Sequence, residues 1–101
     1  MSGYDSPATT EAFYRLLETG LFTEEELKIA KTWLYESYFG VGMSPNKTGM
    51  IIGRTGTYLQ QLCKQGKIRA NRNMMGWYEI PVDEIIRLKK EAKEKNENRS
   101  R

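Results

Sequence analysis

Residues 56–65 bring together side chains that can form hydrogen bonds with the edges of DNA bases. Glutamine can bind adenine through two hydrogen bonds in the major groove, and threonine can contact a thymine methyl group or a phosphate. The candidates for base contacts are Thr57, Tyr58, Gln60 and Gln61. The alternative is that Gln60 and Gln61 are solvent-exposed residues that favour a helix.

Basic side chains lie on either side of this segment and suit the phosphate backbone of a nucleic acid. Such contacts orient a protein on the duplex and make its affinity depend on salt, but they carry little sequence information. The candidates for backbone contacts are Lys47, Arg54, Thr55, Lys64, Lys67, Arg69 and Arg72. The alternative is a basic face that only contacts solvent.

The charge of the chain is uneven. The net charge is +3 over 101 residues, but residues 1–43 carry −4 and residues 44–101 carry +7. An acidic half joined to a basic half favours a single surface that faces a polyanion. The basic half is also the half that contains the candidate DNA contacts.

Two short helices are expected to position these candidates. Ser44-Pro45 is a helix start, with a serine cap followed by proline in the first turn, and the helix continues to about Ile51 with Met50 and Ile51 as its core residues. Gly53 permits a turn, and Thr55 caps a second helix over residues 56–65. Leu59, Leu62 and Cys63 share the inward face of that helix, which leaves the polar candidates on its outer face.

A basic hairpin is expected next. Residues 67–72 and 77–80 are β-prone, and residues 71–76 form the tip, where asparagine and glycine tolerate positive φ. Trp77 and Tyr78 are expected in the hairpin core, whereas Met74 and Met75 pack under the hairpin or lie on its surface. Pro81 begins a last helix, which the charged tail from Lys89 extends by a turn or two.

The first 43 residues predict two further helices after a flexible start at residues 1–8. The first helix covers residues 9–19, with Phe13, Leu16 and Leu17 on one face. The second begins at Thr23, which forms a capping box with Glu26.

Aromatic residues gather near the end of the second helix, namely Trp33, Tyr35, Tyr38 and Phe39. They either pack inside the protein or form a surface for a dimer or another partner.

Taken together, residues 44–88 resemble the winged helix-turn-helix domain of the excisionase and MerR-like superfamily. The resemblance rests on the order of the Thr55-capped helix, then Lys64-Gln65-Gly66-Lys67-Ile68, then Gly76-Trp77-Tyr78-Glu79-Ile80-Pro81 and Asp83-Glu84. It implies double-stranded DNA binding, with the capped helix in the major groove and the wing on the flanking backbone. Members include excisionases, transcription regulators, chromosome-organising factors and small terminase subunits.

Two positions depart from the pattern of this superfamily. Arg54 stands where an apolar residue is usual, and Glu79 stands where a basic residue is usual. A carboxylate beside the wing is expected to repel phosphate, which leaves wing contacts to Arg69 and Arg72.

The expected fold is therefore mainly α with a small β-hairpin, a winged helix-turn-helix preceded by two N-terminal helices. The expected organisation is a flexible start (1–8), a helical extension that packs on the domain or dimerises (9–43), the winged helix-turn-helix (44–90) and a charged tail (91–101).

Composition argues against several other classes of protein. The chain has no histidine and a single cysteine, Cys63, so neither a disulfide within the chain nor a histidine-dependent metal site or catalytic triad is expected. Residues 49–56 resemble a phosphate-binding loop but lack its Gly-Lys-Ser/Thr ending. We therefore expect neither an enzyme nor a cofactor. The absence of a secretory or membrane-spanning segment predicts a cytoplasmic protein, in a bacterial cytoplasm or nucleoid.

The leading hypothesis is a small sequence-selective DNA-binding protein of a phage, plasmid or bacterial mobile element, either a regulator or an excisionase-like architectural factor. A module this small makes few base contacts, so a homodimer, a cooperative array or a second protein is expected to add specificity. The alternative is a protein-interaction module on a winged-helix scaffold, which binds a host or phage protein.

Overall fold

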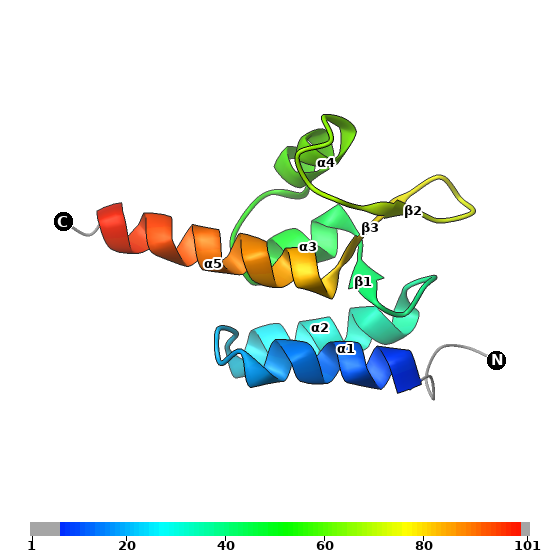
Figure 1. Cartoon of the computed structure of the whole chain (residues 1–101), viewed down its shortest axis with the longest axis horizontal. Helices are drawn as coiled ribbons and strands as arrows, with labels where there is room; N and C mark the ends of the chain where they lie inside the picture. The colour runs from blue at the N-terminus through cyan, green and yellow to red at the C-terminus, as the bar shows by residue number, and fades with distance from the viewer. Residues whose placement is uncertain (1–6, 100–101) are drawn as a thin grey trace.

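Two N-terminal helices form the lower layer of the computed structural model, which describes the backbone of residues 7–99 and the side chains of residues 7–95 (Figure 1). They are α1 (Pro7–Glu18) and α2 (Glu24–Glu36). Residues 1–6 of the predicted flexible start lie outside the described residues, and the prediction is wrong for Pro7 and Ala8, which already belong to α1. The predicted capping box of α2 is confirmed, because Glu26 N donates to Thr23 Oγ1 at 3.1 Å and Thr23 N donates to Glu26 Oε1 at 2.9 Å.

The buried face of α1 differs from the predicted one. Leu16 is fully buried and Phe13 packs half-buried against the core, as predicted, but Leu17 is 43% exposed, and Thr9 and Ala12 take its place on the inner face. A helical repeat allows either Leu17 or the pair Thr9 and Ala12 beside Leu16 on the inner face. The contacts of α1 with α2 and α5 select the pair with the smaller side chains.

Helices α3 (Pro45–Ile52) and α4 (Gly56–Lys64) follow the predicted course. Ser44 Oγ accepts from Lys47 N at 3.3 Å, and Thr55 Oγ1 accepts from Tyr58 N at 3.1 Å, so both predicted caps are confirmed. Gly53 has φ 81°, as expected of a residue that ends α3 in the left-handed region.

One core assignment in α3 is wrong. Met50 is 56% exposed, and Ile51 and Ile52 are the buried residues. Gly49 is also buried and lies directly against the carbonyl oxygen of Arg54, where a side chain would clash with the backbone of the turn. The glycine is thus needed for the close return of the chain after α3.

The sheet has three antiparallel strands in the order β1-β3-β2, one more than the predicted hairpin. The strands are β1 (Gly42–Met43), β2 (Asn71–Arg72) and β3 (Tyr78–Pro81). Gly42 pairs with Pro81 and Met43 with Ile80. A strand of two residues after a glycine-rich stretch has too little alternation to be recognised in the sequence. Strand β2 is also shorter than the predicted segment 67–72.

The last helix, α5 (Val82–Arg99), begins one residue later than predicted, since Pro81 belongs to β3, and continues well beyond the turn or two expected after Lys89. Arg87 bridges Glu84 and Glu91, both at 3.0 Å, along its surface. Ala92 is buried beyond Lys89, so packing accounts for part of this extension.

All layers share one hydrophobic core, to which both halves of the chain contribute. Lys89 of α5 also joins the halves, because its Nζ lies 3.0 Å from Glu26 Oε2 and donates to the carbonyl of Ile51 at 2.9 Å. The described part of the chain is thus a mainly helical domain of five helices and a small three-stranded sheet. In this part no helix combines the length and apolar character needed to span a membrane.

Candidate nucleic-acid interface

Helix α4 presents the polar face that its sequence predicts. Leu59 is fully buried and Cys63 is 8% exposed, so these two residues anchor the helix to the core. The opposite face is exposed and contains Thr57, Gln60, Gln61 and Lys64. The predicted inward and outward positions of α4 therefore agree with the structure.

A groove of about 420 Å³ separates α4 from the β2–β3 hairpin. The start of α3 forms its floor, and its walls are polar, basic and aromatic. The lining residues are Ser44, Pro45, Asn46, Gln60, Lys64, Arg72, Gly76, Trp77 and Tyr78. This groove brings together Gln60, Lys64 and Arg72, three of the residues selected from sequence.

Trp77 is the residue of this groove whose position differs most from the prediction. It was expected in the hairpin core, but its side chain is 64% exposed. Tyr78 is half-buried against the core and Ile80 is fully buried, so these two alternate residues define the inner face of β3. The period of two places Trp77 opposite Tyr78 and Ile80, but Glu79 on the same side as Trp77 is buried, so alternation alone does not give the exposure of Trp77.

Glu79 does not face the groove as a repelling charge, so that expectation is wrong. Its side chain is 5% exposed, and its carboxylate accepts from the backbone N–H of Tyr38 at 2.8 Å and of Phe39 at 3.1 Å. Asn73 Nδ2 donates a third hydrogen bond at 3.2 Å. The carboxylate therefore ties the hairpin to the chain after α2.

Not all candidates meet at the groove. Tyr58 lies on the side of α4 nearer α5, with the Arg54 guanidinium 6.0 Å from its ring centre. Lys47 Nζ lies 4.0 Å from the ring centre of Trp33, beside a second groove under the hairpin. The hydroxyl oxygen of Thr55 caps α4. None of these residues lines the groove.

Three basic residues follow α4 and lead into the hairpin. Lys67, Arg69 and Arg72 are all exposed. Arg72 lies with its guanidinium carbon 4.9 Å from the ring centre of Tyr78, which holds it beside the groove. Arg69 is fixed through its backbone, because its N–H donates to Glu84 Oε2 at 2.9 Å.

Glu84 thereby links α5 to the basic connection after α4. The hydrogen bond from the Arg87 side chain is the main cause that holds the pKa of Glu84 below its ordinary value, and the bond from the Arg69 backbone acts in the same direction. A carboxylate with these donors stays ionised at neutral pH. It therefore fixes the end of this connection, just before β2, through the backbone N–H of Arg69.

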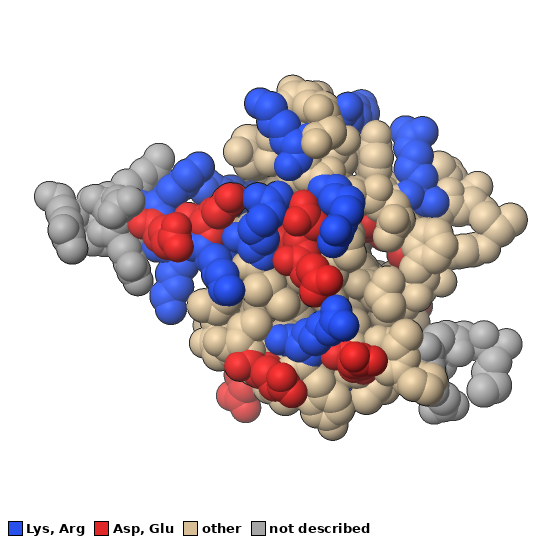
Figure 2. All heavy atoms as spheres, viewed as in Figure 1, with Lys and Arg blue, Asp and Glu red and all other residues tan. Residues whose placement is uncertain are grey.

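Figure 2 shows how charged side chains are distributed on one face of the molecule. Lys and Arg lie over α4 and along α5, where Asp and Glu are interleaved, and further acidic side chains lie at the lower edge. Among the described residues, no group of His, Cys, Asp and Glu could hold a metal ion.

Two further predictions concern Cys63 and Tyr35. Cys63 is buried, and burial is the main cause that raises the pKa of its thiol, so it packs as a core residue. Tyr35 is half-buried and its hydroxyl lies 3.4 Å from Thr10 Oγ1, whereas Trp33, Tyr38 and Phe39 remain substantially exposed. Tyr35 thus belongs to the contact between α1 and α2.

No protein-family model, curated protein sequence or solved structure matches the chain.

Proposed function

We propose that this protein binds double-stranded DNA without catalysing a reaction. On this proposal, α3 and α4 form a helix-turn-helix, α4 enters the major groove, and the β2–β3 hairpin acts as a wing on the flanking backbone. The observation that supports it most directly is the groove between α4 and the hairpin, where Gln60 lies among the basic side chains of Lys64 and Arg72. Polar base-contacting groups beside phosphate-binding groups are the combination that duplex recognition requires.

On this proposal, different exposed side chains would contact the bases and the phosphates. Gln60, Gln61 and Thr57 on α4 would contact bases. Lys64 and Arg72 would bind the two sides of one phosphate backbone that passes along the groove, and Lys67 and Arg69 would extend that track. Arg54 lies just before α4 and Tyr58 lies in its first turn, and both would contact the backbone on the opposite side of the major groove.

The biological role we propose is that of a regulator or an excisionase-like architectural factor of a phage, plasmid or bacterial mobile element. This part rests on the resemblance of residues 44–88 to the excisionase and MerR-like superfamily. The spacing of the Thr55 cap, the basic segment after α4 and the Gly76-to-Pro81 strand carries that resemblance.

The test is selection from a pool of random duplex DNA at about 50 and about 200 mM salt, followed by sequencing of the retained fraction. A six- to ten-phosphate interface would lose roughly 10³–10⁵ in affinity between these conditions. We expect strong salt dependence and an enriched sequence. Retention without enrichment would reduce the proposal to nonspecific binding, and no retention at either salt would refute it.

The alternative function is a protein-interaction module on the same scaffold. It is favoured by the exposure of Trp77 at 64%, Met74 at 84% and Tyr38 at 55%, all of which lie near the hairpin. This alternative predicts that the chain binds a host or phage protein and has no affinity for duplex DNA.

A further inference from the structure

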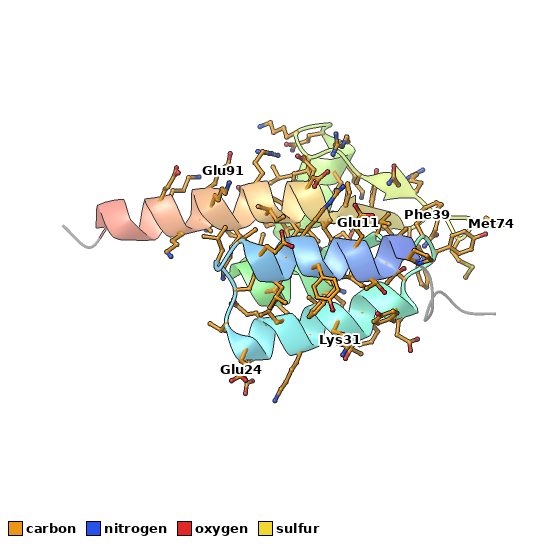
Figure 3. The ribbon with its side chains drawn as sticks, turned by 60° about the horizontal axis from the view of Figure 1, so that its bottom comes forward. Glu11, Glu24, Lys31, Phe39, Met74 and Glu91 are labelled. Atoms are coloured by element: carbon orange, nitrogen blue, oxygen red, sulfur yellow. The ribbon has the colours of Figure 1, made fainter. Side chains whose placement is uncertain are left out.

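A continuous apolar surface covers the underside of the hairpin and the end of α2. It combines two segments that lie more than thirty residues apart in the sequence. Figure 3 shows Phe39 and Met74, one from each segment, at the same end of the molecule. We call this surface the aromatic–methionine face; its residues and exposed fractions are Trp33 (36%), Tyr38 (55%), Phe39 (45%), Met74 (84%), Met75 (67%) and Trp77 (64%).

Direct contacts hold the two segments of this face together. The hydroxyl of Tyr38 donates to the sulfur of Met74, and the Tyr38 and Phe39 rings meet edge to face with centres 5.2 Å apart. A groove of about 340 Å³ runs between the segments, with Trp33, Met75 and Trp77 among its lining residues. The face is therefore a single surface and not a set of isolated exposed side chains.

The tip of the hairpin is held in a defined conformation. Asn73 Oδ1 accepts from Met75 N at 2.9 Å and from Trp77 N at 3.1 Å, and Asn73 N donates to the carbonyl of Trp77 at 2.9 Å. Gly76 has φ 81°, a backbone conformation that favours glycine. The backbone of this tip therefore loses little conformational entropy when the surface becomes covered.

The exposed area is of the size that a stable protein contact needs. If about 200 Å², a value for aromatic residues, is taken for each of the six, their exposed fractions correspond to about 700 Å² in total, polar atoms included. This total approaches the roughly 800 Å² that each partner contributes to a standard interface.

We propose that the aromatic–methionine face is the interface at which two copies of this chain associate. Its groove carries little net charge at the surface, because exposed Glu36 and half-buried Lys47 are opposite in sign and Glu79 is buried. A second copy can therefore meet it without like-charge repulsion. The basic face of α4 would repel its own copy. Elsewhere in residues 7–95, the large exposed apolar side chains are Tyr14 and Leu17 on α1, Met50 on α3 and Tyr58 on α4.

The position of this face matters for DNA binding, and this step rests on the proposed function. Trp77 lines both the groove beside α4 and the groove beneath the hairpin. Two copies joined at the face would therefore hold their hairpins next to each other, with one DNA-facing groove on each copy. A pair of half-sites would then supply the specificity that one small α4 lacks.

The test is sedimentation equilibrium of the full chain without DNA, over protein concentrations up to about 1 mM, which is the weak end of measurable association. Met75→Glu places a charge in the face, and Met50→Glu makes the same change on exposed α3 and serves as the matched control. Far-UV circular dichroism and the thermal midpoint establish that both variants fold. Deletion of residues 1–43 is a poor test, because it would remove β1 and part of the shared core.

We expect the mass of the wild type to rise from the monomer value of 11.7 kDa towards twice that value. Met75→Glu should weaken association by about tenfold or more, and Met50→Glu should leave it unchanged. A wild type that stays monomeric throughout, or equal effects of the two variants, would overturn the proposal. Self-association is measured without DNA, so it succeeds or fails separately from DNA binding.

Discussion

The carboxylate of Glu79 and the backbone N–H of Tyr38 connect the two halves of this protein. Glu79 Oε2 accepts that N–H at 2.8 Å, across 41 positions of sequence. The same carboxylate binds the N–H of Phe39 and the side chain of Asn73, which shapes the tip of the hairpin. One buried acid therefore fixes the hairpin relative to α2, and with it both the groove beside α4 and the aromatic–methionine face.

Removal of this carboxylate should destabilise the protein strongly. Glu79→Ala leaves two backbone donors and the Asn73 amide without their acceptor, so we expect the free energy of unfolding to fall by about 3 kcal/mol. Glu79→Gln keeps one acceptor oxygen and should cost about 1 kcal/mol. Urea denaturation measures both values. Glu91→Ala, which removes only an exposed ion pair with Arg87, should change the free energy by less than about 0.5 kcal/mol. Similar values for Glu79→Ala and Glu91→Ala would contradict this role.

If Gln60 contacts a base, its removal should relax sequence preference. Gln60→Ala should reduce discrimination at one position of the enriched site by about 1–3 kcal/mol, because a bidentate contact is lost. Gln65→Ala is the matched control, since Gln65 is exposed at the end of the same helix but does not line the groove. Competition binding against single-base variants of the site measures both. Equal loss of affinity for every sequence would place Gln60 outside base recognition.

Lys64 should act through phosphate, and its removal should therefore change the dependence on salt. Lys64→Ala should reduce the slope of log affinity against log salt by about 0.9, since one contact fewer releases fewer counterions. Lys28→Ala is the control, because Lys28 is an exposed lysine of α2 that does not line the groove. This variant should leave the slope of log affinity against log salt unchanged. Fluorescence anisotropy over a salt series measures this slope. An unchanged slope in Lys64→Ala would exclude Lys64 from the interface.

Local signals in the sequence predicted the helices well. The Thr23, Ser44 and Thr55 caps and the Gly53 turn depend on neighbouring residues only, and all are present as predicted. The inward face of α4 also followed from its period, because Leu59 and Cys63 leave no equivalent alternative face.

Contacts between distant segments account for the errors. Strand β1 exists only because Gly42 and Met43 pair with β3, nearly forty residues later. Glu79 is buried because its carboxylate accepts from the N–H groups of Tyr38 and Phe39, about forty positions away, and no local pattern in the sequence indicates these donors. The exposure of Trp77 likewise depends on how β3 is covered. For the candidate site, the sequence identified Gln60, Lys64 and Arg72, but only the fold brings these three residues to one groove.

Thr9 offers a test of the packing between α1 and the chain after α2. Its side chain is fully buried, and its hydroxyl is the one described buried side-chain polar atom without a hydrogen-bond partner. Thr9→Val keeps the shape and removes the desolvated hydroxyl, so we expect the free energy of unfolding to rise by about 1 kcal/mol. Thr48→Val is the control, because Thr48 Oγ1 donates to the carbonyl of Met43 at 3.4 Å. Thermal and urea denaturation should show stabilisation only for Thr9→Val, and a loss of stability there would mean that the hydroxyl is solvated or bonded.

Glu84 should make the stability depend on pH in the acid range. Its pKa is lowered in the folded protein, chiefly by the hydrogen bond from Arg87 and also by that from the Arg69 backbone. The folded state therefore binds this proton less readily than the unfolded state, and the carboxylate stabilises the fold above its unfolded pKa of about 4.3. That contribution is lost as the pH falls through the folded pKa. Glu84→Gln should cost about 1 kcal/mol at pH 7, and its difference from the wild type should shrink below about pH 4.

The matched control for this pH series is Glu94→Gln, which alters an exposed carboxylate on the same helix. Urea denaturation at intervals from pH 7 to pH 3 gives the free energies for all three proteins. A Glu84→Gln difference that stays constant over this range would show that the carboxylate charge is not what stabilises the link between α5 and the segment after α4. A difference that closes on acidification would show that the ionised carboxylate of Glu84 stabilises the fold, chiefly through the hydrogen bond from Arg87 and also through that from the Arg69 backbone.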